Sequence, residues 1–327
     1  MINIKVSTVA PEWDWIRQTP KNDGVWENCR FVFDQQTKTC DYWIVYENIL
    51  QQETALCPAQ NKILLTGEPK SIKTYHPKFL AQFDMIISCH TNLKHPNVLV
   101  SHPSLPWMIG YQPPEKTFTK SYTELTKNEK PTKTKLISVI CSNKTHTRGH
   151  RKRLDFVKKL QEHFGDYIDF YGRGFIPIQD KWDAIAPYKY HIALENSAYN
   201  HYWTEKLTDA FLADSYPIYY GCPNIKDYFP ADSLTKIDIN KPEESFLVIE
   251  QVIKNNSYEK SIATQKQAKD LVLNKYNFFP RMVKLCQEEI KEKREITLYS
   301  QDYFWKQDPI YKKVIRKIFY VAPSNTP

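Results

Sequence analysis

The chain has 327 residues, 41% of them hydrophobic, which suits two domains of ordinary size or one large domain and excludes an intrinsically disordered chain. Only 8 glycines are present, and neither G-x-G-x-x-G nor G-x-x-x-x-G-K-S/T occurs, which excludes both glycine-rich phosphate-binding loops. The net charge of +8 indicates an anionic partner, which at this point can be nucleic acid, acidic lipid or a nucleotide.

Short apolar runs in the first third of the chain predict the buried strands of an α/β domain. The predicted strands are Ile2–Val9, Tyr42–Tyr46, Ile63–Thr66, Met85–Ser88 and Val98–Ser101. The stretch 112–135 that follows is rich in proline and lysine and has little periodicity, so we interpret it as a linker between domains.

A second α/β series follows the linker. It starts with strand Leu136–Cys141 and helix His150–Glu162, which carries an apolar stripe. The other predicted elements are strands Ile168–Tyr171, Tyr190–Leu194, Pro217–Tyr220 and Leu234–Ile239, a helix after Thr204, and helices Pro242–Lys254, Tyr258–Lys275 and Phe279–Arg294.

These elements predict an N-terminal domain with its linker at 1–134, a second domain at 135–295 and a tail at 296–327. Alternating strands and helices are typical of doubly wound parallel sheets, so we expect two such sheets facing one cleft. Ligands of these sheets bind at the carboxyl ends of the strands, beside the first turns of the helices that follow.

Seven cysteines are scattered along the chain without a C-x-x-C pair, and their odd number favours thiols in a reducing compartment. There is no run of 18 apolar residues, and a strand-like segment follows Met1 directly. We therefore expect a cytoplasmic protein, or one bound peripherally to the cytoplasmic face of a membrane.

Two helices of the second domain start with cations. Lys206 lies in the first turn of the helix after Thr204, and the segment 144–153 (KTHTRGHRKR) places five basic residues at the start of the other helix. Because the first turn of a helix carries partial positive charge, cations are disfavoured there unless they reach into solvent or an anion binds. A bound diphosphate would pair with the side chains and accept hydrogen bonds from the unpaired N–H groups.

Four polar residues are arranged around the second of these helices. Glu195 and Asn196 follow a buried strand directly, and Glu205 and Lys206 begin the next helix. The loop between them returns both pairs to the same edge of the sheet. Carboxylates at such an edge can accept hydrogen bonds from sugar hydroxyls, while the lysine binds phosphate, although a single carboxylate at a strand end is more often a solvated or capping group.

The segment 195–224, ENSAYNHYWTEKLTDAFLADSYPIYYGCPN, resembles the signature of glycosyltransferase family 10, the α1,3/4-fucosyltransferases. The segments 138–143 (SVICSN) and 171–174 (YGRG) are similar to motifs that precede this signature. Residues 64–88 are more loosely similar to a strand of the family that ends in a catalytic Glu. In two places the chain departs from the pattern, with Pro69 after that Glu and with Asn200-His201 where many members have an acidic residue.

The resemblance implies a soluble, bacterial-type member with a GT-B fold, in which two Rossmann-like domains face a central cleft. The N-terminal domain would bind the acceptor, and the second domain would bind GDP-β-L-fucose. The reaction would be inverting and would need no metal ion, which agrees with the absence of D-x-D and of histidines at ligand spacing. The family alignment makes Glu68 the candidate base, whereas the pattern alone reads it as a surface carboxylate. The donor-binding residues that the motifs imply are Ser142, Asn143, Arg148, Arg151, Tyr171, Gly172, Glu195, Asn196, Tyr202, Thr204, Glu205 and Lys206.

The acceptor that the resemblance implies is a hydroxyl of an oligosaccharide or glycolipid, as in α1,3 linkage to GlcNAc or Glc of a lactosamine-like, lactose-like or lipopolysaccharide glycan. One alternative is a transferase that uses another GDP-sugar. An alternative of a different class is a nucleic-acid-binding protein, which the net charge motivates, although cations at strand-to-helix turns fit a diphosphate better than a duplex.

The C-terminal tail combines aromatic and basic residues. In 302–320 an apolar helical stripe lies beside Lys312, Lys313, Arg316 and Lys317, as in a basic amphipathic helix. Such a helix can lie on an anionic membrane, or it can pack its stripe back on the N-terminal domain.

Overall fold

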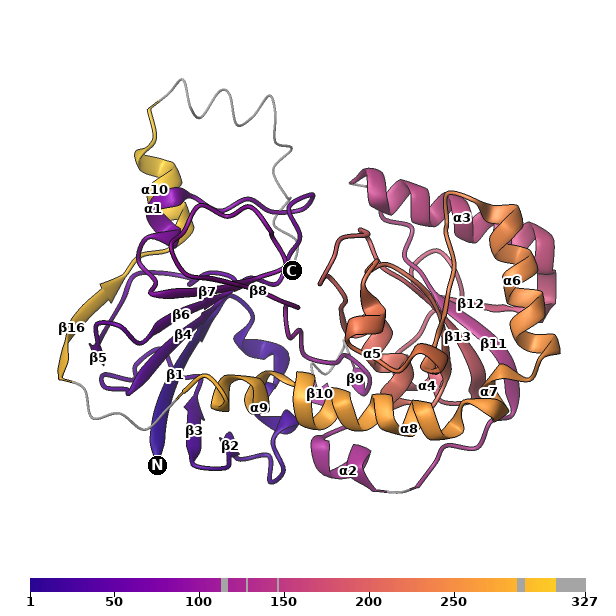
Figure 1. Cartoon of the computed structure of the whole chain (residues 1–327), viewed down its shortest axis with the longest axis horizontal. Helices are drawn as coiled ribbons and strands as arrows, with labels where there is room; N and C mark the ends of the chain where they lie inside the picture. The colour runs from indigo at the N-terminus through magenta and orange to yellow at the C-terminus, as the bar shows by residue number, and fades with distance from the viewer. Residues whose placement is uncertain (113–116, 128, 146, 287–291, 310–327) are drawn as a thin grey trace. The chain divides into compact units, whose positions relative to one another are not determined.

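The computed structural model describes residues 1–112, 117–127, 129–145, 147–286 and 292–309. The chain divides into two compact units (Figure 1). Unit 1 contains residues 1–13, 24–103 and the described residues from 283 onward, and unit 2 contains residues 14–23 and 104–282. Both units are built on a parallel α/β sheet, so the two Rossmann-like sheets that a GT-B fold requires are present.

Unit 1 is built on a seven-stranded sheet with the order β2-β3-β1-β4-β6-β7-β8. All neighbouring strands are parallel except β2 and β3. Every residue of β4 is buried, as expected when both faces of a parallel sheet are covered. The strands are β1 (Ile2–Thr8), β2 (Val25–Trp26), β3 (Cys29–Val32), β4 (Tyr42–Tyr46), β6 (Lys62–Leu65), β7 (Met85–Ser88) and β8 (Val98–Val100).

Residues from the C-terminal end of the described chain complete unit 1. Strand β16 (Lys293–Leu298) pairs antiparallel with β5 (Glu53–Pro58), and α10 (Gln301–Gln307) lies beside α1 (Pro77–Leu80), as Figure 1 shows. The predicted helix Phe279–Arg294 is therefore wrong at residues 284–286, which follow the end of α9 (Phe278–Val283), and at residues 292–294, while residues 287–291 lie outside the described residues. The tertiary partner decides this, because Ile296 and Leu298 alternate onto the unit 1 core in the manner of a strand.

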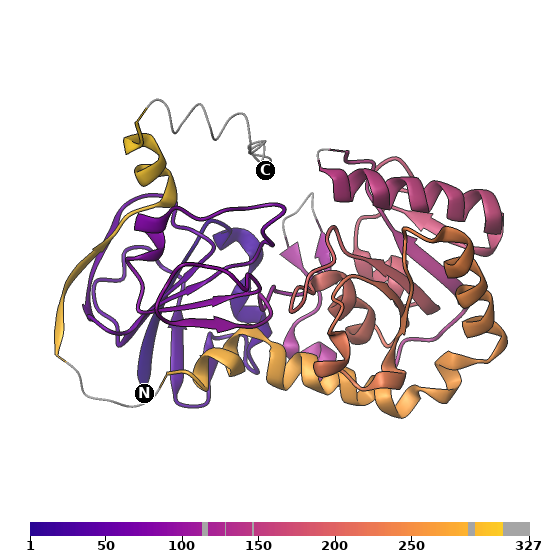
Figure 2. The same ribbon diagram turned by 45° about the horizontal axis from the view of Figure 1, so that its top comes forward.

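Unit 2 is built on a five-stranded, wholly parallel sheet with the order β12-β11-β13-β14-β15 (Figures 1 and 2). Its strands are β11 (Lys135–Ile140), β12 (Asp169–Tyr171), β13 (Tyr188–Leu194), β14 (Tyr216–Tyr220) and β15 (Thr235–Lys236). Helices α3 (Arg148–Phe164) and α6 (Pro242–Lys254) cover one face, and α4 (Lys181–Ile185), α5 (Glu205–Leu212) and α8 (Ile262–Leu271) cover the other. The predicted helix Tyr258–Lys275 is divided in the structure. It consists of α7 (Ser257–Lys260), α8 and a π-helical turn at Val272–Tyr276.

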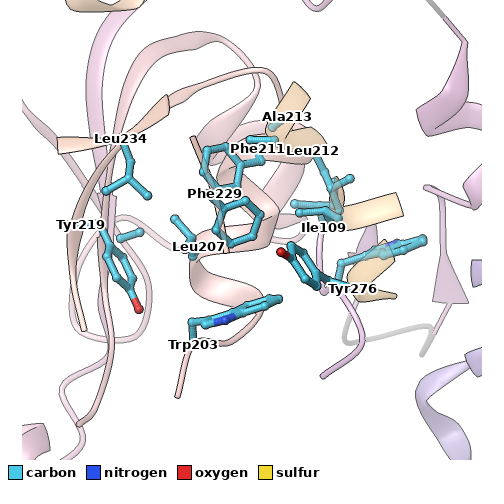
Figure 3. Packing of buried hydrophobic residues seen from close by; sticks show 14 of the residues in the cluster. Ile109, Trp203, Leu207, Phe211, Leu212, Ala213, Tyr219, Phe229, Leu234 and Tyr276 are labelled. Atoms are coloured by element: carbon cyan, nitrogen blue, oxygen red, sulfur yellow. The ribbon is translucent and has the colours of Figure 1, made fainter. Parts of the chain in front are cut away.

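An aromatic-rich cluster fixes the position of α5 (Figure 3). Leu207 and Phe211 point from α5 into the cluster, where they meet Trp203 and Phe229. Full burial of one such side chain stabilises the fold by roughly 1.5–3 kcal/mol. The start of α5 is thereby held rigidly at the edge of the sheet.

Residues 104–126 belong to unit 2 rather than to a linker. This stretch forms β9 (Tyr111–Gln112), β10 (Thr117–Phe118) and α2 (Tyr122–Thr126), whose start is stabilised by a capping box between Ser121 and Glu124. Trp107 and Ile109 are part of the cluster under α5. That packing explains why the units divide at 103/104, whereas the sequence predicted a boundary at 134/135.

Candidate active site

A cavity of about 580 Å³ opens in unit 2 at the carboxyl ends of β11 and β13, beside the first turns of α3 and α5. This is the position at which ligands bind parallel α/β sheets. Basic side chains outnumber acidic ones in its lining. The basic residues are Lys144, Arg153, Arg173, Lys181 and Lys206, and the acidic residues are Glu205 and Asp209.

Arg153 is the most buried of these cations, with an exposed fraction of 5%. Its guanidinium donates to the side-chain oxygen of Asn196 and to Oγ of Ser142, at 3.4 Å. Its Nε–H has no hydrogen-bond partner among the described residues. The guanidinium is thus fixed against two predicted donor-binding residues and keeps an unused donor.

Lys206 lies among carboxylates at the start of α5. Its ammonium is 2.9 Å from Oε1 of Glu205 and 3.9 Å from Oε2 of Glu195. The carboxylate of Glu195, fully buried, accepts hydrogen bonds from both the N–H and the hydroxyl of Thr204, each at 2.8 Å. Thr204 in turn caps α5 through its side chain, so Glu195 holds the turn that presents Lys206.

Glu195, Glu205 and Lys206 shift one another's pKa values. Burial raises the pKa of Glu195 to about 7, and Lys206 offsets only part of that rise. Burial alone would also raise the pKa of Glu205, but the ammonium groups of Lys206 and Lys181 outweigh it and lower this pKa to about 2. Desolvation opposes the charge of Lys206, yet Glu205 and Glu195 raise the pKa of Lys206 above its usual value. Lys206 and Glu205 are therefore both charged at neutral pH.

A second ion pair lies deeper in the cavity and was not predicted. Lys181 is 3.2 Å from Oδ2 of Asp209, whose Oδ1 accepts from the N–H groups of Met108 and Ile109. The spacing of Glu205 and Asp209 at i and i+4 on α5 places both carboxylates on one helix face, which could have identified Asp209. Lys181 comes from α4, more than 20 positions earlier in the chain, and no local signal connects the two residues.

Gly149 allows the two loops of the site to meet. A Cβ atom at this position, the second residue of α3, would lie 1.9 Å from the carbonyl oxygen of Asn196. Only glycine permits so close an approach of the helix start to the loop after β13. The two basic helix starts, for which the sequence predicts one bound diphosphate, therefore both contribute residues to one cavity.

The structure brings some predicted donor-binding residues together and leaves others outside the cavity lining. Ser142, Asn196, Glu205 and Lys206 line the cavity, and Glu195 and Thr204 support it from behind. The predicted residues outside the lining are Asn143, Arg148, Arg151, Tyr171, Gly172 and Tyr202.

These outer residues have structural surroundings of their own. Arg148 and Arg151 are exposed, and the guanidinium of Arg151 donates to the carbonyl oxygen of Thr145 at 2.9 Å. Tyr171 shares a hydrogen bond of 2.6 Å with the hydroxyl of Tyr188, and Tyr202 is buried.

Arg153 lines the cavity but was not among the predicted residues. It shares the buried helix face with Val157 and Leu160, at i+4 and i+7, so the apolar stripe of α3 could have identified it.

Glu68, the candidate base, belongs to unit 1. It follows β6 by three residues and is partly buried. Its N–H donates to Oε1 of Glu47 at 2.8 Å, and its carbonyl oxygen lies 2.8 Å from Nε2 of His90.

The described residues contain no group of three or more His, Cys, Asp or Glu side chains placed to hold a metal ion. Among the same residues no helix is both long and apolar enough to cross a membrane.

Comparisons with known proteins place the chain among fucosyltransferases. The profile described as "Glycosyltransferase family 10 (fucosyltransferase) C-term" matches residues 130–305. The mouse and human proteins named "4-galactosyl-N-acetylglucosaminide 3-alpha-L-fucosyltransferase 9" are 30% identical over 188 residues, which cover 54% of this chain and 50% of each relative. The chain thus spans about half the length of the curated relatives it matches.

A solved structure described as "Crystal Structure of alpha1,3-Fucosyltransferase with GDP-fucose" is 15% identical, with a TM-score of 0.47 and coverage of 99% of this chain and 93% of that chain. The profile match includes the whole five-stranded sheet of unit 2 and every residue that lines the cavity. The chain therefore belongs to glycosyltransferase family 10, the fucosyltransferases.

Proposed function

We propose that this chain is an inverting fucosyltransferase that transfers L-fucose from GDP-β-L-fucose to a hydroxyl group of a glycan. The observation that carries the proposal is the cavity at the strand ends of unit 2, where five basic side chains meet two acidic ones. A nucleoside diphosphate brings the negative charge that this excess of cations would balance. The family profile covers this same cavity.

In the proposed reaction the acceptor hydroxyl attacks the anomeric carbon of fucose on the face opposite to GDP. The bond to the diphosphate breaks, and negative charge develops on the leaving oxygen. Lys206, Arg153 and the first turn of α5 would stabilise this charge, because they are held in place before the reaction starts. Glu205, ionised beside Lys206, would accept hydrogen bonds from sugar hydroxyls.

The proton of the acceptor hydroxyl needs a base, and we assign this role to Glu68. A positioned general base contributes about 10²–10⁴-fold to a rate. Glu68→Gln should therefore lower turnover by about 10²-fold or more, with GDP affinity unchanged because Glu68 belongs to the other unit. A variant with wild-type turnover and the same acidic limb in its pH profile would remove Glu68 from this role.

The acceptor, the linkage and the location are also proposals. The name of the relatives, a 3-α-L-fucosyltransferase of a galactosyl-N-acetylglucosaminide, supports an α1,3 linkage to a lactosamine-like glycan, and a lipopolysaccharide that carries such a unit is included in the proposal. The basic and aromatic tail supports a cytoplasmic enzyme that contacts an anionic membrane at its periphery. The apolar stripe of this tail starts at Ile310, outside the described residues, while residues 293–309 pack on unit 1.

The decisive assay measures GDP release from GDP-fucose with an array of oligosaccharide acceptors. GDP-mannose in place of GDP-fucose tests the alternative of another GDP-sugar. Release only with GDP-mannose, or no release together with salt-sensitive binding of DNA or RNA, would overturn the proposal. Sedimentation with anionic and with neutral vesicles tests the membrane contact separately.

We further expect activity without a metal ion, because lysine and arginine side chains would take the place of a cation beside the diphosphate. Turnover should persist in EDTA at the wild-type rate. Complete loss in EDTA that Mn²⁺ or Mg²⁺ restores would contradict this expectation.

A further inference from the structure

The buried carboxylate of Glu47 in unit 1 accepts hydrogen bonds from several donors at the turn that contains Glu68. Oε1 of Glu47 accepts from the N–H groups of Gly67 and Glu68 and from the hydroxyl of Tyr75, the last two at 2.8 and 2.7 Å. Oε2 of the same residue pairs with the ammonium of Lys73. Glu47 has an exposed fraction of only 7%, so this set of bonds lies out of water.

The backbone around Glu47 is adapted to this contact. Glu47 follows β4 directly and has a φ of 67°, in the left-handed region that residues with a Cβ atom adopt at a cost in free energy. At Gly67 a Cβ atom would lie 2.7 Å from the hydroxyl of Tyr46 and 3.2 Å from Oε1 of Glu47. A left-handed backbone at Glu47 and the absence of a side chain at Gly67 together let the carboxylate approach the turn.

The turn is also held at its other end. Nε2 of His90 lies 2.8 Å from the carbonyl oxygen of Glu68, and the His90 ring packs edge-on against Tyr75 at 5.6 Å. Both peptide groups of Glu68 are therefore fixed by buried side chains. Glu68 itself is only partly buried.

We infer that Glu47 is a positioning residue that sets the backbone of Glu68 and thereby the direction of its carboxylate. The inference rests on the proposed function, in which Glu68 is the base. Glu47 does not act as a base in this arrangement, because Lys73, Tyr75 and the two N–H groups occupy its oxygens. Burial would raise the pKa of Glu47, but Lys73 and the hydrogen bonds from Tyr75 and the Glu68 N–H together lower it, so the carboxylate stays charged and keeps accepting.

The test separates positioning from stability with a matched control in the same unit. Glu53 is a similarly buried carboxylate that pairs with Lys5 and accepts from Ser7, and among the described residues it shares no hydrogen-bond partner with Glu47. Glu47→Gln should lower kcat for GDP-fucose and N-acetyllactosamine by about ten- to a hundredfold, the usual effect of a misplaced catalytic group, with the KM for GDP-fucose unchanged. Glu53→Gln should lower the melting temperature but leave kcat within about twofold. An equal loss of kcat in both variants would overturn the inference.

A double variant shows whether Glu47 acts through Glu68. If it does, Glu47→Gln should add no further loss to Glu68→Gln, since a base that is absent cannot be misplaced. Losses that multiply would overturn the inference. If Glu68→Gln keeps wild-type turnover, both this inference and the assignment of the base fail. If Glu68→Gln is inactive and Glu47→Gln is not, only this inference fails.

If Glu47→Gln folds poorly, a second variant and a measurement that does not depend on activity still test the inference. Glu47→Asp keeps the charge beside Lys73 and tolerates a left-handed backbone, but its shorter side chain cannot reach both N–H groups. It should recover the melting temperature and not kcat. Hydrogen exchange of the Gly67 and Glu68 amides should accelerate in Glu47→Asp and not in Glu53→Gln. Unchanged protection of these amides would overturn the inference without any activity measurement.

Discussion

Lys206 stands at the positive end of α5, where the helix dipole alone would disfavour a cation by about 0.3–1 kcal/mol. The structure adds two carboxylates within 4 Å, of Glu205 and Glu195, and these interactions are larger than the dipole term. The lysine is thus held in place with or without a ligand. Its partners fix its position, and the remaining cations of the cavity supply the excess of positive charge.

Removal of the Lys206 ammonium should weaken GDP binding and nearly abolish transfer. Lys206→Ala should also lower the stability by about 1–3 kcal/mol, because Glu205 and the fully buried Glu195 lose their ion-pair partner. Calorimetry with GDP and thermal melting measure both effects. Unchanged GDP affinity would contradict the role of Lys206 in donor binding, and a more stable variant would show that the dipole term dominates.

Arg153 and Arg151 lie two positions apart on α3 and provide a matched pair. Arg153 lines the cavity, whereas Arg151 is exposed and contacts Thr145. Arg153→Ala should weaken GDP binding by about ten- to a hundredfold, the value of one or two charge-assisted hydrogen bonds. Arg151→Ala removes the same charge and should change the Kd for GDP less than about threefold. The reverse order of the two effects would place the diphosphate on the outer face of α3.

At the scale of elements, the loop between β13 and α5 is stabilised by one buried carboxylate. Glu195 directly follows the strand, and its two oxygens accept hydrogen bonds from the N–H and the hydroxyl of Thr204, which caps the helix. Gly149 lets the start of α3 approach this same loop. The cavity therefore depends on contacts between the loops that follow the strands as well as on the strand residues that line it, such as Ile140 of β11 and Leu194 of β13.

The raised pKa of Glu195 predicts a pH-dependent stability. Because burial raises this pKa from about 4.5 to about 7, the folded chain binds the proton more tightly than the unfolded chain. The stability that this group contributes is complete below about pH 4.5 and is lost as the pH rises through 7, by up to about 3 kcal/mol. Glu195→Gln carries no charge at any pH and escapes this loss.

Melting temperatures measured between pH 5 and 8 check this prediction. The difference between Glu195→Gln and the wild type should grow in favour of the variant as the pH rises. Glu162→Gln, an exposed position on α3, is the matched control and should run parallel to the wild type. Parallel curves for Glu195→Gln would show that Lys206 keeps the carboxylate charged throughout.

At the scale of the whole molecule, the chain passes between the two units more than once. Residues 14–23 belong to unit 2, and residues from 283 onward return to unit 1. Trp15 packs edge-on against Phe278 at 5.3 Å, and Leu298 of β16 is buried in the unit 1 core. Neither unit is therefore a continuous piece of sequence.

A truncation tests this division. A chain that ends at residue 292 loses β16 and α10, and with them the antiparallel pairing of β5. Unit 1 should melt earlier, whereas GDP binding to unit 2 should keep its affinity. Hydrogen exchange resolves the two units. Equal loss of protection in the five-stranded sheet of unit 2 would contradict the division.

The sequence by itself determined the two α/β series, because they follow from local periodicity. It also determined the family and placed Glu195, Asn196, Glu205 and Lys206 at one end of the sheet, because all four lie in one continuous motif. The apolar stripe of α3 places Arg153 on the buried face of the helix, but only the tertiary structure showed that this part of the helix meets the loops after β11 and β13, where Arg153 lines the cavity. The tertiary structure also decided that residues 293–298 form a strand, because their partner β5 lies more than 200 positions away. Pairings at such separations leave no trace in local patterns, since the hydrogen bonds and the buried area that stabilise them arise only when the chain has folded.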